Sequence, residues 1–220
     1  MRSARVERDV YRRTWIKFCG CRTWSDVSYA IEAGADAVGL IFASSPRKVG
    51  WDDAREISRK LPDEIDPVAV FVDPSAEEID AVCALFRRTF VQLSGKETAG
   101  FVGRYGDRAI KAIHVDARQG SDDIADACRP YGQARILFDA RHGHLAGGTG
   151  TTFPWETVVG IGRERPVVVA GGLTPENVGQ CVRTVRPFGV DVRSGVETGD
   201  RKDVEKMRAF VRAVREADGS

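Results

Sequence analysis

Several features that would assign this sequence to a class at once are missing. Its 33 Lys and Arg residues balance 32 Asp and Glu residues, so the formal net charge is +1 and no broad positive surface for nucleic acid is expected. No apolar run approaches the roughly 20 residues of a membrane-spanning helix. Five cysteines, an odd number, do not predict a disulfide framework. We therefore expect a cytoplasmic protein with reduced thiols and with neither a nucleic-acid nor a membrane partner.

Targeting segments and cofactor motifs are missing as well. Residues 1–14 contain arginines and acidic residues but no apolar stretch, which is not typical of a secretory signal. We expect a flexible extension there, followed by one domain over residues 15–220. The chain has no G-x-x-x-x-G-K-[S/T] motif, and His142 and His144 lie in a glycine-rich stretch that favours surface histidines over metal ligands. We expect no cofactor and no metal ion.

What the sequence does contain is a regular alternation of apolar runs and amphipathic stretches. The expected strands are residues 15–19, 36–42, 67–72, 90–93, 109–115, 135–139, 167–169 and 188–192. They read as continuous apolar runs, as parallel strands buried on both faces do. Eight strand–helix units predict an α/β fold of the single (β/α)₈ TIM-barrel type. An open doubly wound sheet is the alternative, but it usually carries a G-x-G-x-x-G turn after its first strand, where this chain has Cys19-Gly20-Cys21-Arg22.

The last two expected strands both end in small residues. The first of them stops at Gly171-Gly172 and the second at Ser194-Gly195. Glycines let a phosphate approach the backbone, and N–H groups at helix starts attract anions; Thr174 is the expected N-cap of the helix between them. Because barrels often bind phosphate on the loops after strands seven and eight, we predict a phosphate site here, with two ordinary tight turns as the alternative.

Polar residues at strand ends are the candidates for chemistry, because the carboxyl ends of barrel strands face the active site. Cys19 ends the first strand and Asp139 the sixth. Moving a proton between carbon atoms requires a base and an acid. A thiolate is a competent base where a cation such as Lys17 lowers its pKa, and a buried, desolvated Asp can serve as the acid. Taken alone, Cys19 has an inert buried thiol as its alternative, and Asp139 a cap at the end of its strand. Three further cysteines on expected helices are predicted to be inert, while Cys21 stays undecided: Cys83, Cys128 and Cys181.

These residues fall into ordered segments that resemble the phosphoribosylanthranilate isomerase family. The resemblance covers about residues 16–213. The segments are Lys17-Phe18-Cys19-Gly20, EAGADAVGLIFASSPRKV at 32–49, VAVFVDPSAEEI at 68–79, VQL at 91–93, IKAI at 110–113, LFDA at 137–140, GGTGTTFPW at 147–155, AGGLTPENV at 170–178 and GVDVRSGVE at 189–197.

The resemblance implies an Amadori-type aldose–ketose isomerisation of a phosphosugar, N-(5-phosphoribosyl)anthranilate, in tryptophan biosynthesis. It implies Cys19 as the general base for the C2 proton and Asp139 as the general acid for the ring oxygen. It also implies that Arg47 binds the anthranilate carboxylate and that the two glycine-bearing turns hold the phosphate. The full set of predicted substrate-binding residues, with Arg193 included for its place beside the phosphate region and not by the resemblance, is Arg47, Gln92, Asp191, Gly171, Gly172, Arg193, Ser194 and Gly195.

Three departures from the family pattern add positive charge at the expected mouth. Ser94-Gly95-Lys96 stands where the family usually has His-Gly-Asp, Arg193-Ser194-Gly195 where it has Ser-Ser-Gly, and Cys21-Arg22-Thr23 follows Cys19-Gly20. A divergent paralogue acting on another aminosugar phosphate is therefore an alternative, and a non-catalytic phosphosugar-binding barrel is a third hypothesis. Retention of Cys19 and Asp139 argues against the last. We favour the isomerase, as a monomer or homodimer.

Overall fold

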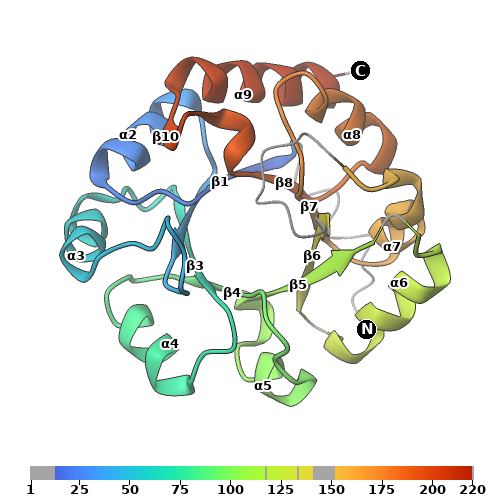
Figure 1. The fold of residues 1–220 in the computed structure, drawn as a ribbon, viewed down its shortest axis with the longest axis horizontal. Coiled ribbons are helices and arrows are strands. Elements are labelled where there is room, and N and C mark those ends of the chain that lie inside the picture. The colour runs from blue at the N-terminus through green and yellow to red at the C-terminus, as the bar shows by residue number, and fades with distance from the viewer. Residues whose placement is uncertain (1–12, 117, 133, 141–151, 220) are drawn as a thin grey trace.

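The chain folds into a closed barrel of eight parallel strands surrounded by helices (Figure 1). The computed structural model describes residues 13–116, 118–132, 134–140 and 152–219. Neighbouring strands in the ring are consecutive in the chain, and β8 closes on β1, which confirms the predicted barrel. The strands are β1 (Trp15–Cys19), β2 (Ala37–Ile41), β3 (Asp66–Phe71), β4 (Phe90–Leu93), β5 (Ala109–Val115), β6 (Arg135–Ala140), β7 (Val167–Val169) and β8 (Gly189–Val192).

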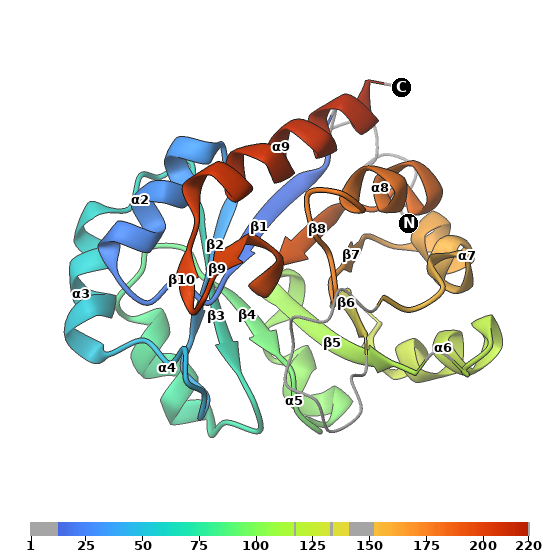
Figure 2. The same ribbon diagram turned by 45° about the horizontal axis from the view of Figure 1, so that its top comes forward.

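Helices follow the strands and cover the outside of the barrel. They are α2 (Trp24–Ala33), α3 (Trp51–Lys60), α4 (Ala76–Cys83), α5 (Ala99–Gly103), α6 (Ser121–Cys128), α7 (Val159–Glu164), α8 (Val178–Val185) and α9 (Val204–Asp218). A small hairpin, β9 (Glu197–Thr198) and β10 (Arg201–Lys202), precedes α9. Figure 2 shows α9 lying between α2 and α8, where it closes the outer layer over β1 and β8. No helix among these ranges is long and apolar enough to cross a membrane.

The predicted N-cap at Thr174 was wrong, because the chain makes one more turn before the helix. The backbone N–H of Thr174 donates to Asn177 Oδ1 at 2.8 Å, and Asn177 Nδ2 donates to the carbonyl of Gly172 at 2.9 Å. Helix α8 therefore starts at Val178, with Asn177 in the N-cap position. The amide of Asn177 thus fixes the glycine turn after β7 instead of extending the helix into it.

Side chains alternate between the barrel interior and the layer under the helices, as the period of two along a strand requires. On β1, Cys19 and Trp15 join the interior cluster, while Phe18 and Ile16 join the cluster under the helices. At the amino-terminal end of the barrel, Trp15 packs against Phe90 and Phe188. Aromatic side chains therefore fill the barrel interior at its amino-terminal end. The candidate reactive groups lie toward the carboxyl ends of the strands.

The first turn of the described chain is tied to the last helix. The backbone N–H of Thr14 donates to Asp218 Oδ2 at 3.0 Å, and Arg215 donates to the Thr14 carbonyl. The barrel elements thus run from Trp15 to Asp218. Residues 1–12 lie outside the described residues, and the flexible extension stays a prediction.

Candidate active site

Cys19 lies inside the barrel beside a buried ion pair. Lys17, two residues earlier on β1, donates from Nζ to Asp191 Oδ2 of β8 at 2.9 Å, and the Lys17 side chain is fully buried. Gly39 of β2 provides the space, since a Cβ there would lie 2.9 Å from both Cys19 Sγ and Lys17 Cε. The other carboxylate oxygen of Asp191 is buried and has no hydrogen-bond partner in the described part of the chain. The three side chains form one polar cluster at the carboxyl ends of β1 and β8.

The charges of this cluster are set by burial and by each other. Burial raises the pKa of the Cys19 thiol, and the neighbouring Lys17 ammonium partly offsets that rise. Burial also opposes the charge on Lys17, but Asp191 and Cys19 outweigh it and hold the Lys17 pKa above its ordinary value. Lys17 is therefore a cation at neutral pH, placed to stabilise a thiolate whenever Cys19 loses its proton.

Asp139 ends β6 and faces the mouth rather than the barrel core. Its side chain is 39% exposed, so the expectation of a buried, desolvated carboxyl was wrong. In the β5–β6 register it lies opposite His114, whose Nδ1 is 3.9 Å from Asp139 Oδ2. His114 Nε2 lies 3.2 Å from the carbonyl of Ser94, which can only accept, so Nε2 carries the proton. The neighbour of the acid candidate is thus His114, a polar strand-end residue to which the sequence assigned no role.

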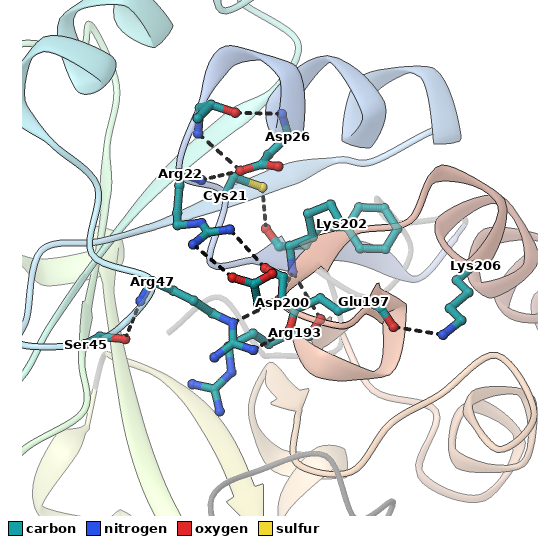
Figure 3. Close-up of polar contacts among 12 residues, drawn as sticks. Cys21, Arg22, Asp26, Ser45, Arg47, Arg193, Glu197, Asp200, Lys202 and Lys206 are labelled. Atoms are coloured by element: carbon teal, nitrogen blue, oxygen red, sulfur yellow. Dashed lines mark hydrogen bonds and ion pairs between the residues drawn. The ribbon is translucent and has the colours of Figure 1, made fainter.

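Arg47, after β2, is held by a carboxylate that follows β8. Its Nε donates to Glu197 Oε1 at 3.1 Å and its Nη2 to Glu197 Oε2 at 2.6 Å (Figure 3). Lys202 Nζ donates to the same Oε1 at 3.0 Å. Burial opposes ionisation of Glu197, but Arg47 and Lys202 outweigh it and lower the pKa of this carboxyl. The guanidinium expected to bind substrate is therefore oriented by Glu197.

Lysine and arginine side chains fix the hairpin that carries Glu197 by donating to backbone carbonyls in and beside it. Lys202 Nζ donates to the Arg193 carbonyl at 3.0 Å, and Lys206 Nζ to the Glu197 carbonyl at 2.8 Å. Arg22 donates to the Asp200 carbonyl at 2.9 Å, which ties the β1–α2 loop to the hairpin turn. All of these residues appear in Figure 3. The orientation of Arg47 thus rests on a braced backbone.

The loops after β7 and β8 touch each other, as the predicted phosphate site requires. Gly171 and Gly172 both have positive φ, 78° and 68°. A Cβ on Gly171 would lie 2.3 Å from the Ala140 nitrogen, and one on Gly195 would lie 1.9 Å from the Leu173 carbonyl oxygen. No side chain fits at either position. Ser194 stands beside Gly195 and is partly exposed.

Gln92 lies across the ring from these loops, near the end of β4. Its Nε2 donates to Ser94 Oγ at 3.2 Å, while its Oε1 is buried without a hydrogen-bond partner among the described residues. The loop that follows is fixed by Glu97, which accepts from Lys111 Nζ at 2.7 Å and from the Gly95 N–H at 3.0 Å. On the β4 side, Glu97 therefore sets the shape of the mouth by holding the loop backbone.

The arrangement matches one family along almost its whole length. A family model described as N-(5'phosphoribosyl)anthranilate (PRA) isomerase matches residues 16–213. The chain belongs to this family. The isomerase of Pseudomonas fluorescens (strain SBW25) is 42% identical over 207 residues, which are 93% of this chain and 97% of the relative. That of Moorella thermoacetica is 40% identical over 205 residues, 92% of this chain and 90% of the relative.

Solved structures of phosphoribosylanthranilate isomerases have the same fold. The crystal structure from Thermotoga maritima is 34% identical, with a TM-score of 0.83, and covers 92% of this chain and 99% of its own. A structure in complex with reduced 1-(o-carboxyphenylamino)-1-deoxyribulose 5-phosphate is 33% identical, with a TM-score of 0.80 and the same coverage. A third structure is described as mutually generated monomers of the dimeric Thermotoga maritima enzyme.

Within this isomerase family, the chain's departures each have a structural setting. Arg22 pairs with Asp200, and the side chain of Lys96 is exposed while its backbone N–H donates to Asp73. Cys21 packs under the helices, where burial raises its pKa to about 12, so it is an inert thiol. Burial also raises the pKa values of the thiols on α4, α6 and α8, as predicted for inert cysteines: Cys83, Cys128 and Cys181.

One functional candidate, Glu197, was missed in the sequence, and another, His114, was a strand-end residue without an assigned role. Glu197 is part of the GVDVRSGVE segment, but nothing in the pattern indicates that it reaches Arg47. His114 is a polar residue at the end of an apolar strand, and only the β5–β6 register places it opposite Asp139. His142 and His144 lie outside the described residues. The described part of the chain has no cluster of three or more metal-ligand side chains, and the metal-free site stays a prediction.

Proposed function

We propose that this chain isomerises N-(5-phosphoribosyl)anthranilate to 1-(2-carboxyphenylamino)-1-deoxyribulose 5-phosphate. The observation that carries the proposal is the placement of Cys19 and Asp139. Both stand at carboxyl ends of strands, on β1 and β6, and the glycine loops after β7 and β8 lie between those strands in the ring. A sugar phosphate bound by these loops has a base on one side and an acid on the other.

The first step is opening of the ribose ring. Asp139 donates its proton to the ring oxygen while the lone pair of the anthranilate nitrogen forms a double bond to C1. The C1–O bond breaks, its electron pair stays on oxygen, and the product is a protonated Schiff base. Asp139 is suited to this step because its side chain faces the mouth, where it reaches a bound sugar.

The second step is transfer of the C2 proton to Cys19. The thiolate takes the proton, the C–H electron pair forms the C1–C2 double bond, and the C1–N double bond becomes a lone pair on nitrogen. The resulting enolamine gains a proton at C1 and loses one from the C2 hydroxyl, which gives the ketose. C1 is reduced and C2 oxidised within one molecule, so the electrons balance. Lys17 supports this step by stabilising the thiolate.

Substrate binding is divided among groups already positioned in the free site. The N–H groups around Gly172 and Gly195 receive the phosphate. Arg47 binds the carboxylate of the anthranilate ring, and the unpartnered oxygen of Asp191 accepts the N–H of the substrate amine. Gln92 Oε1 is a second buried acceptor at the floor of the mouth.

The decisive experiment follows loss of the fluorescence of freshly made phosphoribosylanthranilate in the wild type, Cys19→Ser and Asp139→Asn. We expect each substitution to lower kcat by about 10²-fold or more, the usual contribution of a positioned acid or base. Cys83→Ser, which changes a half-buried thiol on α4, is the matched control and should keep full activity. Near-wild-type turnover by Cys19→Ser or Asp139→Asn would refute the assigned roles. A folded wild type without turnover would favour a different aminosugar phosphate, or a binding protein.

A further inference from the structure

Two arginine side chains converge over the residue that follows the proposed base. A Cβ built on Gly20 would lie 3.3 Å from Arg47 Cδ, 3.4 Å from Arg193 Cγ and 3.5 Å from Arg193 Cδ. Gly20 has a φ of 75° and leaves the space through which both stems pass. Arg47 arrives from the loop after β2 and Arg193 from the end of β8, so the two guanidinium groups reach the mouth on the Cys19 side.

Arg47 alone offers a reduced set of donors to a substrate. Its Nε and Nη2 groups, the edge that best matches a carboxylate, already donate to Glu197. A second carboxylate must therefore use the Nη1 end of the guanidinium. Glu197 is also shared with Lys202, so it is held in place by two cations and is not a free group that a substrate displaces.

Arg193 has the opposite character. Its backbone carbonyl accepts from Lys202 at 3.0 Å, which fixes the position of its Cα. Its exposed side chain forms no hydrogen bond or ion pair with the residues that the structure describes. With Arg47, Lys202 and Glu197, and with the neighbouring Arg22–Asp200 pair, it makes a group of four cations and two carboxylates. This local excess of positive charge is balanced when an anion binds beside Arg47.

The direction of the Arg193 stem indicates which anion. Although Arg193 immediately precedes the phosphate-loop residue Ser194, its Cγ and Cδ pack over Gly20 at the β1 side, next to Arg47. The glycine turn after β7 that would receive the phosphate contacts the end of β6, where Gly171 lies against Ala140 and Asp139. Arg193 therefore serves the carboxylate end of the substrate rather than its phosphate end.

We propose that Arg193 and Arg47 together bind the anthranilate carboxylate, and that Arg193 makes this isomerase selective for a carboxylated aromatic amine. The proposal rests on the proposed function. Each arginine supplies one or two charge-assisted N–H donors. Those of Arg193 replace, for the substrate carboxylate, the Arg47 donors that Glu197 already occupies.

The test compares two ligands that differ in the carboxylate alone. Calorimetry gives the Kd of reduced 1-(o-carboxyphenylamino)-1-deoxyribulose 5-phosphate and of its phenylamino counterpart for the wild type, Arg193→Ser and Arg193→Lys. Arg201→Ser, which removes another exposed charge from the same hairpin region, is the matched control. Inorganic phosphate, titrated in competition with the first ligand, reports the phosphate loops.

We expect Arg193→Ser to weaken the carboxylated ligand about tenfold, the size of one charge-assisted hydrogen bond, and to leave the other ligand and phosphate within twofold. Arg193→Lys should recover part of the loss, and Arg201→Ser should change nothing. Equal weakening of both ligands, weaker phosphate binding, or no effect would each overturn the proposal. Because these readouts are Kd values, they are separate from the turnover that tests the proposed function.

Discussion

Two buried glutamates at opposite sides of the ring, Glu97 after β4 and Glu197 after β8, perform different tasks with the same chemistry. Each pairs with a buried lysine, Lys111 at 2.7 Å and Lys202 at 3.0 Å. Burial opposes the ionisation of both carboxyls, yet their partners lower both pKa values. The remaining partners differ: Glu97 accepts from the backbone N–H groups of Asp73 and Gly95, whereas Glu197 accepts from the Arg47 guanidinium.

The two carboxylates build the mouth of this barrel in different ways. A carboxylate that takes backbone N–H groups shapes a loop, and here it joins the loops after β3 and β4. A carboxylate that takes a guanidinium instead orients a side chain, which then reaches a ligand. Both ion pairs are nearly inaccessible to water, so breaking either leaves a buried charge uncompensated. We therefore expect similar costs in stability and different costs in binding.

Glu97→Gln and Glu197→Gln give the largest expected effects and test this comparison directly. Each should lower the free energy of unfolding by about 3 kcal/mol, because each breaks a buried ion pair. Glu197→Gln should also raise KM for phosphoribosylanthranilate about tenfold with little change in kcat, the signature of lost uniform binding. Glu97→Gln should leave KM within twofold. Thermal unfolding and steady-state kinetics measure the two quantities, and equal KM effects would remove the distinction between the two glutamates.

A third buried ion pair acts on the proposed base, since Lys17 pairs with Asp191 and also faces Cys19. Lys17→Met, made together with Asp191→Asn so that no single charge stays buried, should lower kcat/KM at pH 7 about tenfold. Burial already raises the Cys19 pKa, and the Lys17 ammonium lowers it more than the Asp191 carboxylate raises it. Loss of both charges therefore raises the Cys19 pKa further, so the thiolate fraction falls at neutral pH and recovers as pH rises. The limb of the kcat/KM profile that rises with pH should therefore move to higher pH.

The control for Lys17 lies on the other side of the ring. Lys111 donates to Glu97 and to the carbonyls of Leu93 and Gly95 and has no contact with Cys19. Lys111→Met with Glu97→Gln should lower stability without moving the pH profile. An unchanged profile in the Lys17 variant would mean that this lysine supports the fold of the barrel and not the base.

The sequence predicted the barrel and the residues at strand ends because these depend on local patterns. Continuous apolar runs at regular spacing indicate buried parallel strands, and a polar residue at the end of such a run falls at the mouth. Cys19 and Asp139 were chosen as candidates in this way, Arg47 by the resemblance, and the two glycine turns by composition. The structure brings Gly171 against β6 and Gly195 against Leu173, contacts that explain why neither position carries a side chain.

What the sequence did not predict depends on contacts between distant segments. Arg47 and Glu197 are 150 residues apart, and no spacing rule connects them. The helix start at Val178 was missed because residues 175–177 form a separate turn, which Asn177 joins to the Gly172 carbonyl. The exposure of Asp139 was missed because a residue at a strand end can be either buried in the barrel interior or exposed at its mouth. Each of these outcomes is decided by tertiary packing.

The smallest expected effect is at His114, which links the loop shaped by Glu97 to the acid on β6. Because Nε2 donates to the Ser94 carbonyl, the Nδ1 side of the ring faces Asp139, 3.9 Å from Oδ2. Nδ1 is thus placed to hold the Asp139 side chain in position for ring opening. The amide of His114→Asn takes the place of Nδ1, whereas that of His114→Gln takes the place of Nε2.

The side chains of His114 and Asp139 are both exposed, so their interaction is weak. We therefore expect His114→Gln to lower kcat about fivefold or less and to leave KM and the unfolding temperature unchanged, while His114→Asn keeps wild-type kcat. The reverse ranking would assign His114 to the loop after β4 rather than to the acid on β6.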